Sequence, residues 1–206
     1  MLRLFAVSCL ALLTPALCIA ARADSARLIT QSTSSDCGPA ALATLLTFYL
    51  DTPAQEAEIM RLASTDPTIG TSLKGLETAA AAKKCDADSF RMDYATLQNQ
   101  LRAFGTPVIV RMLNPEPHFA VVLEANDKEV GLSDPAVGNI IMSRKAFLKR
   151  WIAPAAKPSA PEGYVFVAAR PDGKVNAAAF AQARRDLAQM RRALETKRAP
   201  LIPSFR

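Results

Sequence analysis

The chain has 206 residues, 50% of them hydrophobic and 21% charged, with a mean hydropathy of +0.10. This composition excludes a disordered, collagen-like or multi-span membrane protein and predicts one domain with appendages. The net charge of +6 lies at the ends, because residues 24–169 hold 14 basic and 16 acidic side chains, whereas residues 170–206 hold nine and three. The globular part therefore lacks the clustered positive charge of a nucleic-acid-binding domain, and we expect no nucleic-acid partner.

The first 23 residues have the order of a secretory signal peptide. Arg3 precedes an apolar run over residues 4–21, and Ala21-Arg22-Ala23 places small residues at the two positions that a signal peptidase reads. We expect cleavage near Ala23, which would leave a periplasmic or secreted protein without stable membrane insertion. The alternative is an uncleaved N-terminal anchor, for which the run is long enough, although Pro15 interrupts it.

The predicted domain, residues 24–170, opens with helices. A polar loop over residues 31–36 is followed by a helix from Cys37 to Leu50, with Asp36 as its N-cap, Pro39 in its first turn and apolar residues at helical spacing. Further helices are predicted over residues 52–63, 72–84 and 93–104, with a short strand over residues 87–92.

The second half of the domain is rich in β-branched residues. Strands are predicted over residues 107–113, 118–124, 129–133, 139–142 and 163–170. Turns at Asn114–Pro117 and Asn126-Asp127 separate the first three strands, a helix capped by Ser143 ends at Trp151, and residues 154–161 form a loop. Helices followed by an antiparallel sheet define an α+β fold.

Residues 171–206 form a basic C-terminal helix and tail. A helix is predicted from Val175 to about Glu195, and its apolar stripe consists of Phe180, Leu187, Met190 and Leu194, with arginines on the other faces. We expect this stripe to dock on the domain. The alternatives are a dimerising helix or a helix that contacts anionic lipid or a partner. The residues from Arg198 onward are predicted to be a loose tail.

Cys9 and Cys18 would be removed with the signal peptide, which leaves Cys37 and Cys85. With one histidine and no CxxC pair, a structural zinc site is excluded, and we expect no cofactor. Cys37 is the more informative cysteine because it opens a helix, where the backbone N–H groups and the helix dipole favour the nucleophilic thiolate. Gly38 and Pro39 keep side-chain bulk low beside the sulfur.

The single histidine, His118, opens a strand directly after the proline-rich turn. Asp134 follows the next strand, and a hairpin turn centred near Asn126 would bring these two residues directly opposite each other. An aspartate beside the imidazole would fix its tautomer and stabilise the imidazolium, so that Cys37 and His118 would act as nucleophile and general acid. Each of the three residues taken alone also has an ordinary structural interpretation.

Gln31 lies six residues before Cys37. Its amide, held beside the start of the helix, would donate a hydrogen bond to an oxyanion, with the backbone N–H of Cys37 as the second donor.

Four segments together resemble the bacteriocin-processing, double-glycine cysteine peptidases, which are papain-like enzymes and form family thirty-nine of the cysteine peptidases. These segments are Gln31 with residues 36–42 (Asp-Cys-Gly-Pro-Ala-Ala-Leu), residues 70–76, residues 118–122 (His-Phe-Ala-Val-Val) and residues 132–138 (Leu-Ser-Asp-Pro-Ala-Val-Gly). The resemblance extends from Ile29 to Arg170. It departs from the family at Pro117, where a glycine usually precedes the histidine.

The resemblance implies a papain-like α+β fold in which the cysteine helix packs on the antiparallel sheet. It also implies that Cys37 is the nucleophile, His118 the base and acid, Asp134 the orienting carboxylate and Gln31 the oxyanion donor. With a signal peptide, the chain is similar to stand-alone exported members, some of which accompany secretion systems for peptides or functional amyloid. We therefore expect an exported endopeptidase that cleaves a secreted polypeptide through a thioester acyl-enzyme, after Gly-Gly or other small residues.

Two other functions stay open at this point. One is a non-catalytic peptide-binding module of the same fold, and the other is a related acyl-transfer enzyme such as an amidase or transpeptidase. Cys85 is interpreted as a passive, partly buried thiol, with a reversible disulfide to Cys37 as the alternative.

Overall fold

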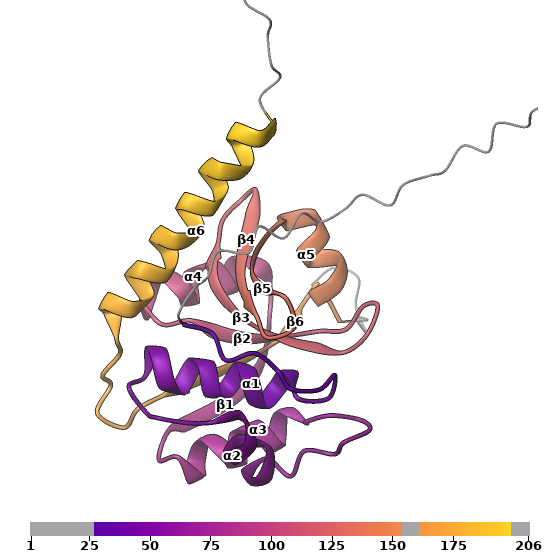
Figure 1. The fold of residues 1–206 in the computed structure, drawn as a ribbon, viewed down its shortest axis with the longest axis vertical. Helices are drawn as coiled ribbons and strands as arrows, with labels where there is room; N and C mark the ends of the chain where they lie inside the picture. The colour runs from indigo at the N-terminus through magenta and orange to yellow at the C-terminus, as the bar shows by residue number, and fades with distance from the viewer. Residues whose placement is uncertain (1–26, 154–160, 199–206) are drawn as a thin grey trace, which may run out of the picture.

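The computed structural model describes residues 27–153 and 161–198. The predicted signal peptide, most of the predicted loop over residues 154–161 and the end of the tail lie outside this part of the chain. In the described residues, helices gather at the N-terminal end and an antiparallel sheet follows, as Figure 1 shows. The predicted α+β class is therefore confirmed.

The helices match most of the predicted ranges. They are α1 (Cys37–Thr44), which continues directly into the π-helical turn η1 (Leu45–Tyr49), α2 (Glu56–Leu62), α3 (Leu73–Ala82), α4 (Tyr94–Ala103), α5 (Arg144–Trp151) and α6 (Ala177–Arg198). The prediction that the second helix begins at Thr52 is wrong by four residues. Thr47 Oγ1 accepts from Ala54 N at 2.9 Å and donates to Ala54 O at 3.0 Å, and these bonds hold the intervening segment outside the helix.

The strands form one six-stranded antiparallel sheet in the order β1-β6-β2-β3-β4-β5. They are β1 (Asp86–Met92), β2 (Val108–Met112), β3 (His118–Ala125), β4 (Glu129–Asp134), β5 (Gly138–Ser143) and β6 (Gly163–Ala169). Each face carries its own buried cluster. Side chains of α1, η1 and α6 cover the face that includes Phe119 and Val121, and side chains of α4 and α5 cover the face that includes Ala120 and Val122.

The register of the β3–β4 hairpin differs from the prediction. Val121 lies opposite Ser133, so Asp134 lies beside Ala120 and two residues away from His118, rather than directly opposite it. The turn is centred later than predicted because Asn126 Oδ1 accepts hydrogen bonds from the backbone N–H groups of both Lys128 and Glu129. A β-bulge between Val122 and Glu124 then moves the register back by one residue towards the predicted pairing.

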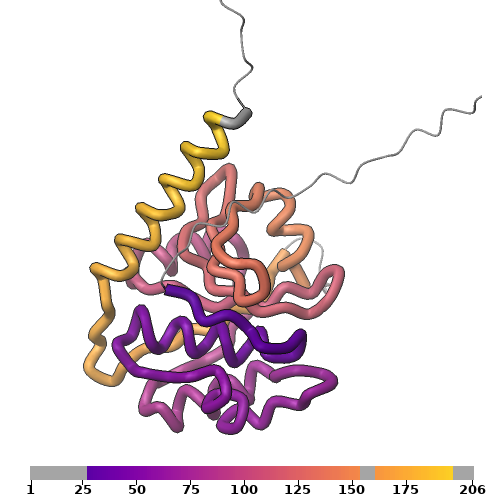
Figure 2. The backbone as a smooth tube through the Cα atoms, viewed as in Figure 1, coloured from indigo at the N-terminus to yellow at the C-terminus, as the bar shows by residue number. Residues whose placement is uncertain are grey.

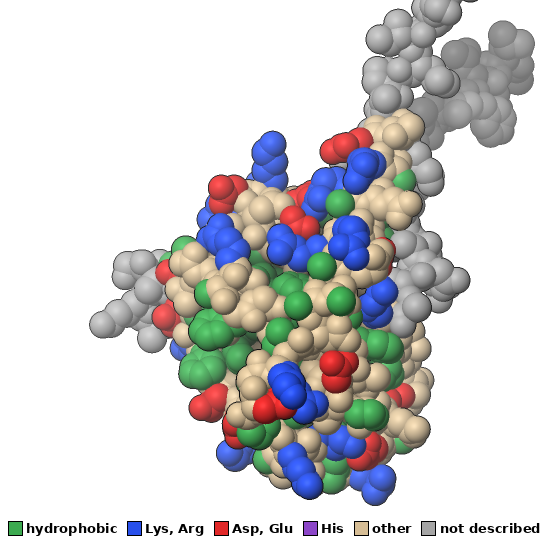
Figure 3. Space-filling view, turned by 90° about the vertical axis from the view of Figure 1, so that its left-hand side faces the viewer, with side chains coloured by type: hydrophobic (Ala, Val, Ile, Leu, Met, Phe, Trp, Pro, Cys, Tyr) green, Lys and Arg blue, Asp and Glu red, His purple; other side chains and the backbone are tan. Residues whose placement is uncertain are grey.

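The C-terminal helix α6 packs its apolar stripe on the domain, in agreement with the docking interpretation. Phe180, Ala183, Leu187 and Met190 are buried, and Leu187 fills the space above Gly131. Arg27 and Asp186 form an ion pair at 3.2 Å. The helix runs along one side of the molecule in Figure 1, and Figure 3 shows Lys and Arg side chains on this side mixed with Asp and Glu. None of the helices within residues 27–153 and 161–198 is long and apolar enough to span a membrane.

Candidate active site

Cys37 is the first residue of α1, and the chain before it runs back along the same helix (Figure 2). Ile29 N donates to Thr44 Oγ1 at 2.9 Å and so fixes this segment near the far end of α1. Because Cys37 N–H opens the helix, it has no helical acceptor and remains available to a ligand. The Cys37 side chain is 7% exposed and lines a cavity, so the thiol is sheltered yet reachable from solvent.

Asp36 is the N-cap residue of α1, as predicted, but its side chain orders the loop before Cys37. Its carboxylate accepts from Thr33 N at 3.0 Å, from Thr33 Oγ1 at 2.7 Å and from Ser35 Oγ at 3.2 Å, and it makes no capping hydrogen bond to the helix. Asp36 therefore occupies the predicted N-cap position, but without a side-chain capping hydrogen bond. The buried carboxylate takes its donors from Thr33 and Ser35 instead of from the first turn of the helix. These bonds fix the turn that precedes Cys37.

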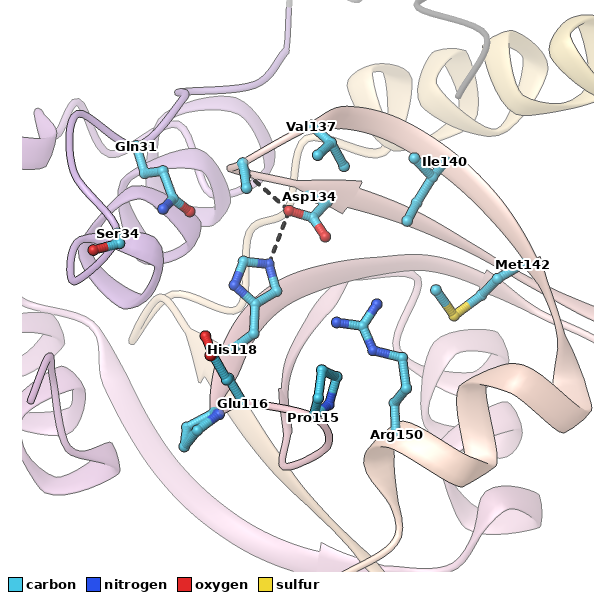
Figure 4. Close-up of a pocket in the computed structure, with 12 residues that line it drawn as sticks. Gln31, Ser34, Pro115, Glu116, His118, Asp134, Val137, Ile140, Met142 and Arg150 are labelled. Carbon is cyan, nitrogen blue, oxygen red and sulfur yellow. Dashed lines mark hydrogen bonds and ion pairs between the residues drawn. The ribbon is translucent and has the colours of Figure 1, made fainter. Parts of the chain in front are cut away.

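His118 and Asp134 come together at one rim of the sheet. His118 Nε2 lies 2.8 Å from Asp134 Oδ1, and the same oxygen accepts from Ala136 N at 2.9 Å (Figure 4). The second bond holds Asp134 in a turn closed by its own side chain. Although Pro117 stands where the resembling family usually has glycine, His118 still reaches its carboxylate.

The environment of His118 favours the imidazolium. Burial by itself would lower the pKa of His118, but hydrogen bonds and charge interactions with Asp134 and Cys37 outweigh it and raise the pKa from 6.5 to about 9. The thiol of Cys37 is thus near enough to the ring to raise the pKa of His118. Since Nε2 is engaged by Asp134, Nδ1 is the nitrogen available to Cys37. The structure therefore brings together the three residues predicted as nucleophile, acid–base group and orienting carboxylate.

Gln31 lies beside this group. Its backbone N–H donates to Pro135 O at 3.0 Å, which ties it to the residue after Asp134, and its side chain points towards His118 in Figure 4. Its Nε2 donates one hydrogen bond to Thr33 O at 2.8 Å, which identifies the nitrogen, because an amide oxygen in that place would face a carbonyl. Its Oε1 is buried and has no hydrogen-bond partner among the described residues.

Two adjoining cavities, one beside His118 and one beside Cys37, form a cleft. The cavity of about 450 Å³ is lined by Gln31, His118 and Asp134, together with Val137 and Arg150. The cavity of about 240 Å³ is lined by Cys37, the loop Thr68–Thr71, Arg111 and Phe119. Both cavities share Ser34, Glu116 and Pro117. The cleft therefore passes over Cys37 and His118 and extends to both sides of them.

Several cleft residues were missed by sequence reasoning. Arg111, the Thr68–Thr71 loop, Glu116 and Arg150 all line the cleft. Arg111 left a signal in the sequence, because it is the one charged residue in the apolar strand Val108–Met112. Arg150 left none, since only the packing of distant segments brings it to the cavity beside His118.

Cys85 lies outside the cleft. It is buried, and its Sγ lies 3.9 Å from Thr52 Oγ1. Both Cys37 and Cys85 are free thiols. Among the residues that the structure describes, no cluster of three His, Cys, Asp or Glu side chains is placed to hold a metal ion.

Comparison with known proteins defines the class of protein. The model of the Peptidase C39 family matches residues 25–158. An uncharacterized protein of Methanothermobacter marburgensis is 39% identical over 122 residues, 59% of this chain and 80% of that protein. The probable functional amyloid protease FapD of Pseudomonas aeruginosa is 31% identical over 133 residues, 61% of this chain and 57% of FapD.

Solved structures show the same fold. The peptidase domain of Streptococcus ComA, a bifunctional ABC transporter, superposes with a TM-score of 0.59 and 24% identity over 70% of this chain and 98% of that domain. A double-glycine-motif protease of a PCAT transporter, in complex with a leader peptide, superposes with a TM-score of 0.55 and 20% identity. This match covers 68% of this chain and 89% of that protein. The chain belongs to the Peptidase C39 family and has the papain-like fold of its peptidase domains. It is a peptidase, and hence a hydrolase.

Proposed function

We propose that the chain is an exported cysteine endopeptidase in which Cys37, His118, Asp134 and Gln31 form the catalytic machinery. The observation that supports this most strongly is the position of His118. Its ring is hydrogen-bonded to Asp134, and Cys37, at the start of α1, contributes with Asp134 to the raised pKa of that ring. This arrangement provides a thiolate, an imidazolium and an orienting carboxylate inside one cleft.

The reaction begins when the Cys37 thiolate attacks the carbonyl carbon of the scissile peptide bond. The negative charge that develops on the carbonyl oxygen is stabilised by Cys37 N–H and by the side-chain amide N–H of Gln31. The C–N bond then breaks, and His118 gives its proton to the departing amine, which leaves a thioester on Cys37. His118, now neutral, takes a proton from water, which attacks the thioester and releases the carboxylic acid and the Cys37 thiolate, so that the thiolate and the imidazolium are restored.

The position of the acid sets the direction of the substrate. His118 must protonate the leaving amine, so the chain that follows the scissile bond lies in the larger cavity beside His118. The acyl portion stays with Cys37 in the smaller cavity. Two exposed apolar side chains stand at these two sides: Ile69 is 85% exposed beside Cys37, and Val137 is 49% exposed beside His118. Such exposed apolar groups are suited to binding a polypeptide.

Crowding next to Cys37 supports a preference for small residues before the scissile bond. A Cβ atom on Gly38 would lie 3.1 Å from Phe119 Cδ2 and 3.2 Å from Thr71 Cβ, so the walls beside the sulfur are already in close contact. The similar double-glycine-motif protease supports the same preference. We therefore propose cleavage after Gly-Gly or another pair of small residues.

Export is the second part of the proposal. It is supported by the signal-like order of residues 1–23 and by the similarity to FapD, whose name describes a functional amyloid protease. The substrate would be a secreted polypeptide, and the partner a peptide or functional-amyloid secretion system. Expression of the full chain in a Gram-negative host, fractionation and N-terminal sequencing test this part. A periplasmic or secreted product that begins at Asp24 supports it, and a cytosolic product that begins at Met1 contradicts it.

Hydrolysis of internally quenched peptides that contain Gly-Gly tests the catalytic part. The wild type is expected to cleave them, whereas Cys37→Ala and His118→Asn abolish cleavage and Gln31→Ala lowers kcat by about 10²-fold, the usual loss for one oxyanion donor. Cys85→Ala is the matched control, because it removes the other free thiol outside the cleft. A wild type that binds these peptides as tightly as Cys37→Ala and cleaves none of them would support the binding-module alternative instead.

A further inference from the structure

Arg111 is the most unusual charged residue in the cleft. It lies on β2 directly opposite Phe119 on β3, and its guanidinium carbon sits 6.0 Å from the centre of the Phe119 ring. This stacking directs the side chain along the face that α1 covers. Arg111 thereby lines the smaller cavity together with Cys37.

Among the described residues, the Arg111 guanidinium has no hydrogen-bond acceptor. Its Nε is buried without a partner, although the residue is only half-buried as a whole. Every other half-buried arginine in the described residues has an acceptor: Arg27 on Asp186, Arg150 on Asn114 O, Arg170 on Asp172 and Arg191 on Glu129. A partly desolvated guanidinium without an acceptor is costly, and an incoming carboxylate would remove that cost.

The acidic side chains near Arg111 do not bind its guanidinium. Glu116 lines the same cavity, yet within the described part of the chain it forms no ion pair with Arg111. Asp36 is held by Thr33 and Ser35, and Asp134 is held by His118 and Ala136. Among the carboxylates in residues 27–153 and 161–198, none therefore forms an ion pair with Arg111 beside Cys37.

We propose that Arg111 binds a carboxylate side chain of the substrate, so that the polypeptide carries an Asp or Glu shortly before the scissile bond. This inference rests on the proposed function, because the acyl portion of the substrate is placed beside Cys37 by the role of His118. A C-terminal carboxylate would lie after the scissile bond, on the His118 side. The group that Arg111 binds is therefore a side chain, held by the planar fork that guanidinium presents to carboxylates.

The test uses peptidyl fluoromethyl ketones that end in Gly and alkylate Cys37. Each carries Glu or Gln at one of the three preceding positions, and intact-mass spectrometry with peptide mapping gives the second-order rate of alkylation. At one position, the wild type is expected to react with the Glu probe about 10- to 100-fold faster than with its Gln counterpart, as a charged hydrogen bond predicts. Arg111→Gln is expected to abolish that preference, so that the Glu and Gln probes alkylate Cys37 at equal rates. Arg61→Gln, which removes an exposed charge from α2 outside the cleft, is expected to keep the preference.

A variant and probe with exchanged charges distinguish loss of the ion pair from a general loss of reactivity at the site. Arg111→Glu is expected to react faster with a Lys probe at the same position than with the Glu probe. Equal rates for Glu and Gln at every position, or an equal loss on both probes in Arg111→Gln, would overturn the role of Arg111 and leave the peptidase function intact. Failure of every probe to alkylate Cys37 would overturn the proposed function and this inference together.

Discussion

His118 and Asp134 meet diagonally across the β3–β4 hairpin, with Nε2 2.8 Å from Oδ1 and the two residues offset by two positions in the register. An offset of two keeps both side chains on the same face of the sheet, because side chains alternate along a strand. An offset of one would have placed them on opposite faces. The bulge between Val122 and Glu124 is therefore compatible with the pair.

Asp134→Asn tests the role of this carboxylate. An amide removes the negative charge that stabilises the imidazolium, so we expect kcat/KM for Gly-Gly peptides to fall by about 10²-fold, at the lower end of general acid–base effects. The pKa of His118 should also fall in this variant, so that His118 loses its proton at a lower pH than in the wild type. Asp127→Asn, at the tip of the same hairpin, is the matched control. An unchanged pH–rate profile in Asp134→Asn would show that the carboxylate does not act through His118.

Gly38→Ala tests the crowding beside Cys37. The added Cβ would meet Phe119 and Thr71 at distances that require both to move, and we expect a loss of about 1–3 kcal/mol in the free energy of unfolding together with slower peptide cleavage. The double variant Gly38→Ala/Phe119→Leu should recover part of both losses, because the smaller side chain frees space. Urea unfolding and peptide hydrolysis measure the two effects, and strictly additive losses would contradict direct contact between these residues.

The order of elements could be predicted from the sequence because it depends on local chemistry. The predicted helices over residues 72–84 and 93–104 and the one capped by Ser143 all form, and Ser72, Asp93 and Ser143 accept hydrogen bonds from Gly75 N, Thr96 N and Ala146 N. Asp36 is an aspartate at an N-cap position, like Asp93, yet its carboxylate turns towards Thr33, because the loop offers it several donors at once. The start of α2 was misplaced for a similar reason, since Thr47 binds Ala54 across seven residues.

The candidate site was predictable in its residue types but not in its geometry. Cys37, His118 and Gln31 stand at the starts or edges of elements, where function is often located, and the sequence shows this directly. The hairpin register depends on the side chain of Asn126 and on a bulge, and neither follows from hydrophobic pattern. The cavity beside Cys37 depends on the packing of Phe119 against Gly38 and Thr71, which only the folded chain brings together.

Leu187→Ala tests the docking of α6. Leu187 is fully buried against Gly131, and its truncation should lower the free energy of unfolding by about 2–5 kcal/mol, the usual range for a buried leucine. Peptide cleavage under native conditions should stay unchanged, because α6 lies outside the cleft. Arg192→Ala, on the exposed side of α6, serves as the control. Equal stability of Leu187→Ala and wild type would indicate that α6 contributes nothing to the folded domain.

The raised pKa of His118 also predicts how stability depends on pH. A group whose pKa is higher in the folded state binds its proton more tightly there, so its stabilising contribution is complete below pH 6.5 and is lost as the pH rises to about 9. We expect the wild type to lose stability over this interval more steeply than His118→Asn. Urea unfolding at several pH values measures the difference, and parallel curves for the two proteins would exclude a raised pKa.

The most direct test of the account is the titration of His118 itself. His118 is the one histidine of the chain, so its imidazole C–H signals in the NMR spectrum of untagged protein are unambiguous. The account predicts a pKa of about 9 in the wild type and lower values in both Cys37→Ala and Asp134→Asn, since each partner raises it. Titration near the ordinary value of 6.5 in all three proteins would contradict a coupled Cys37–His118–Asp134 site.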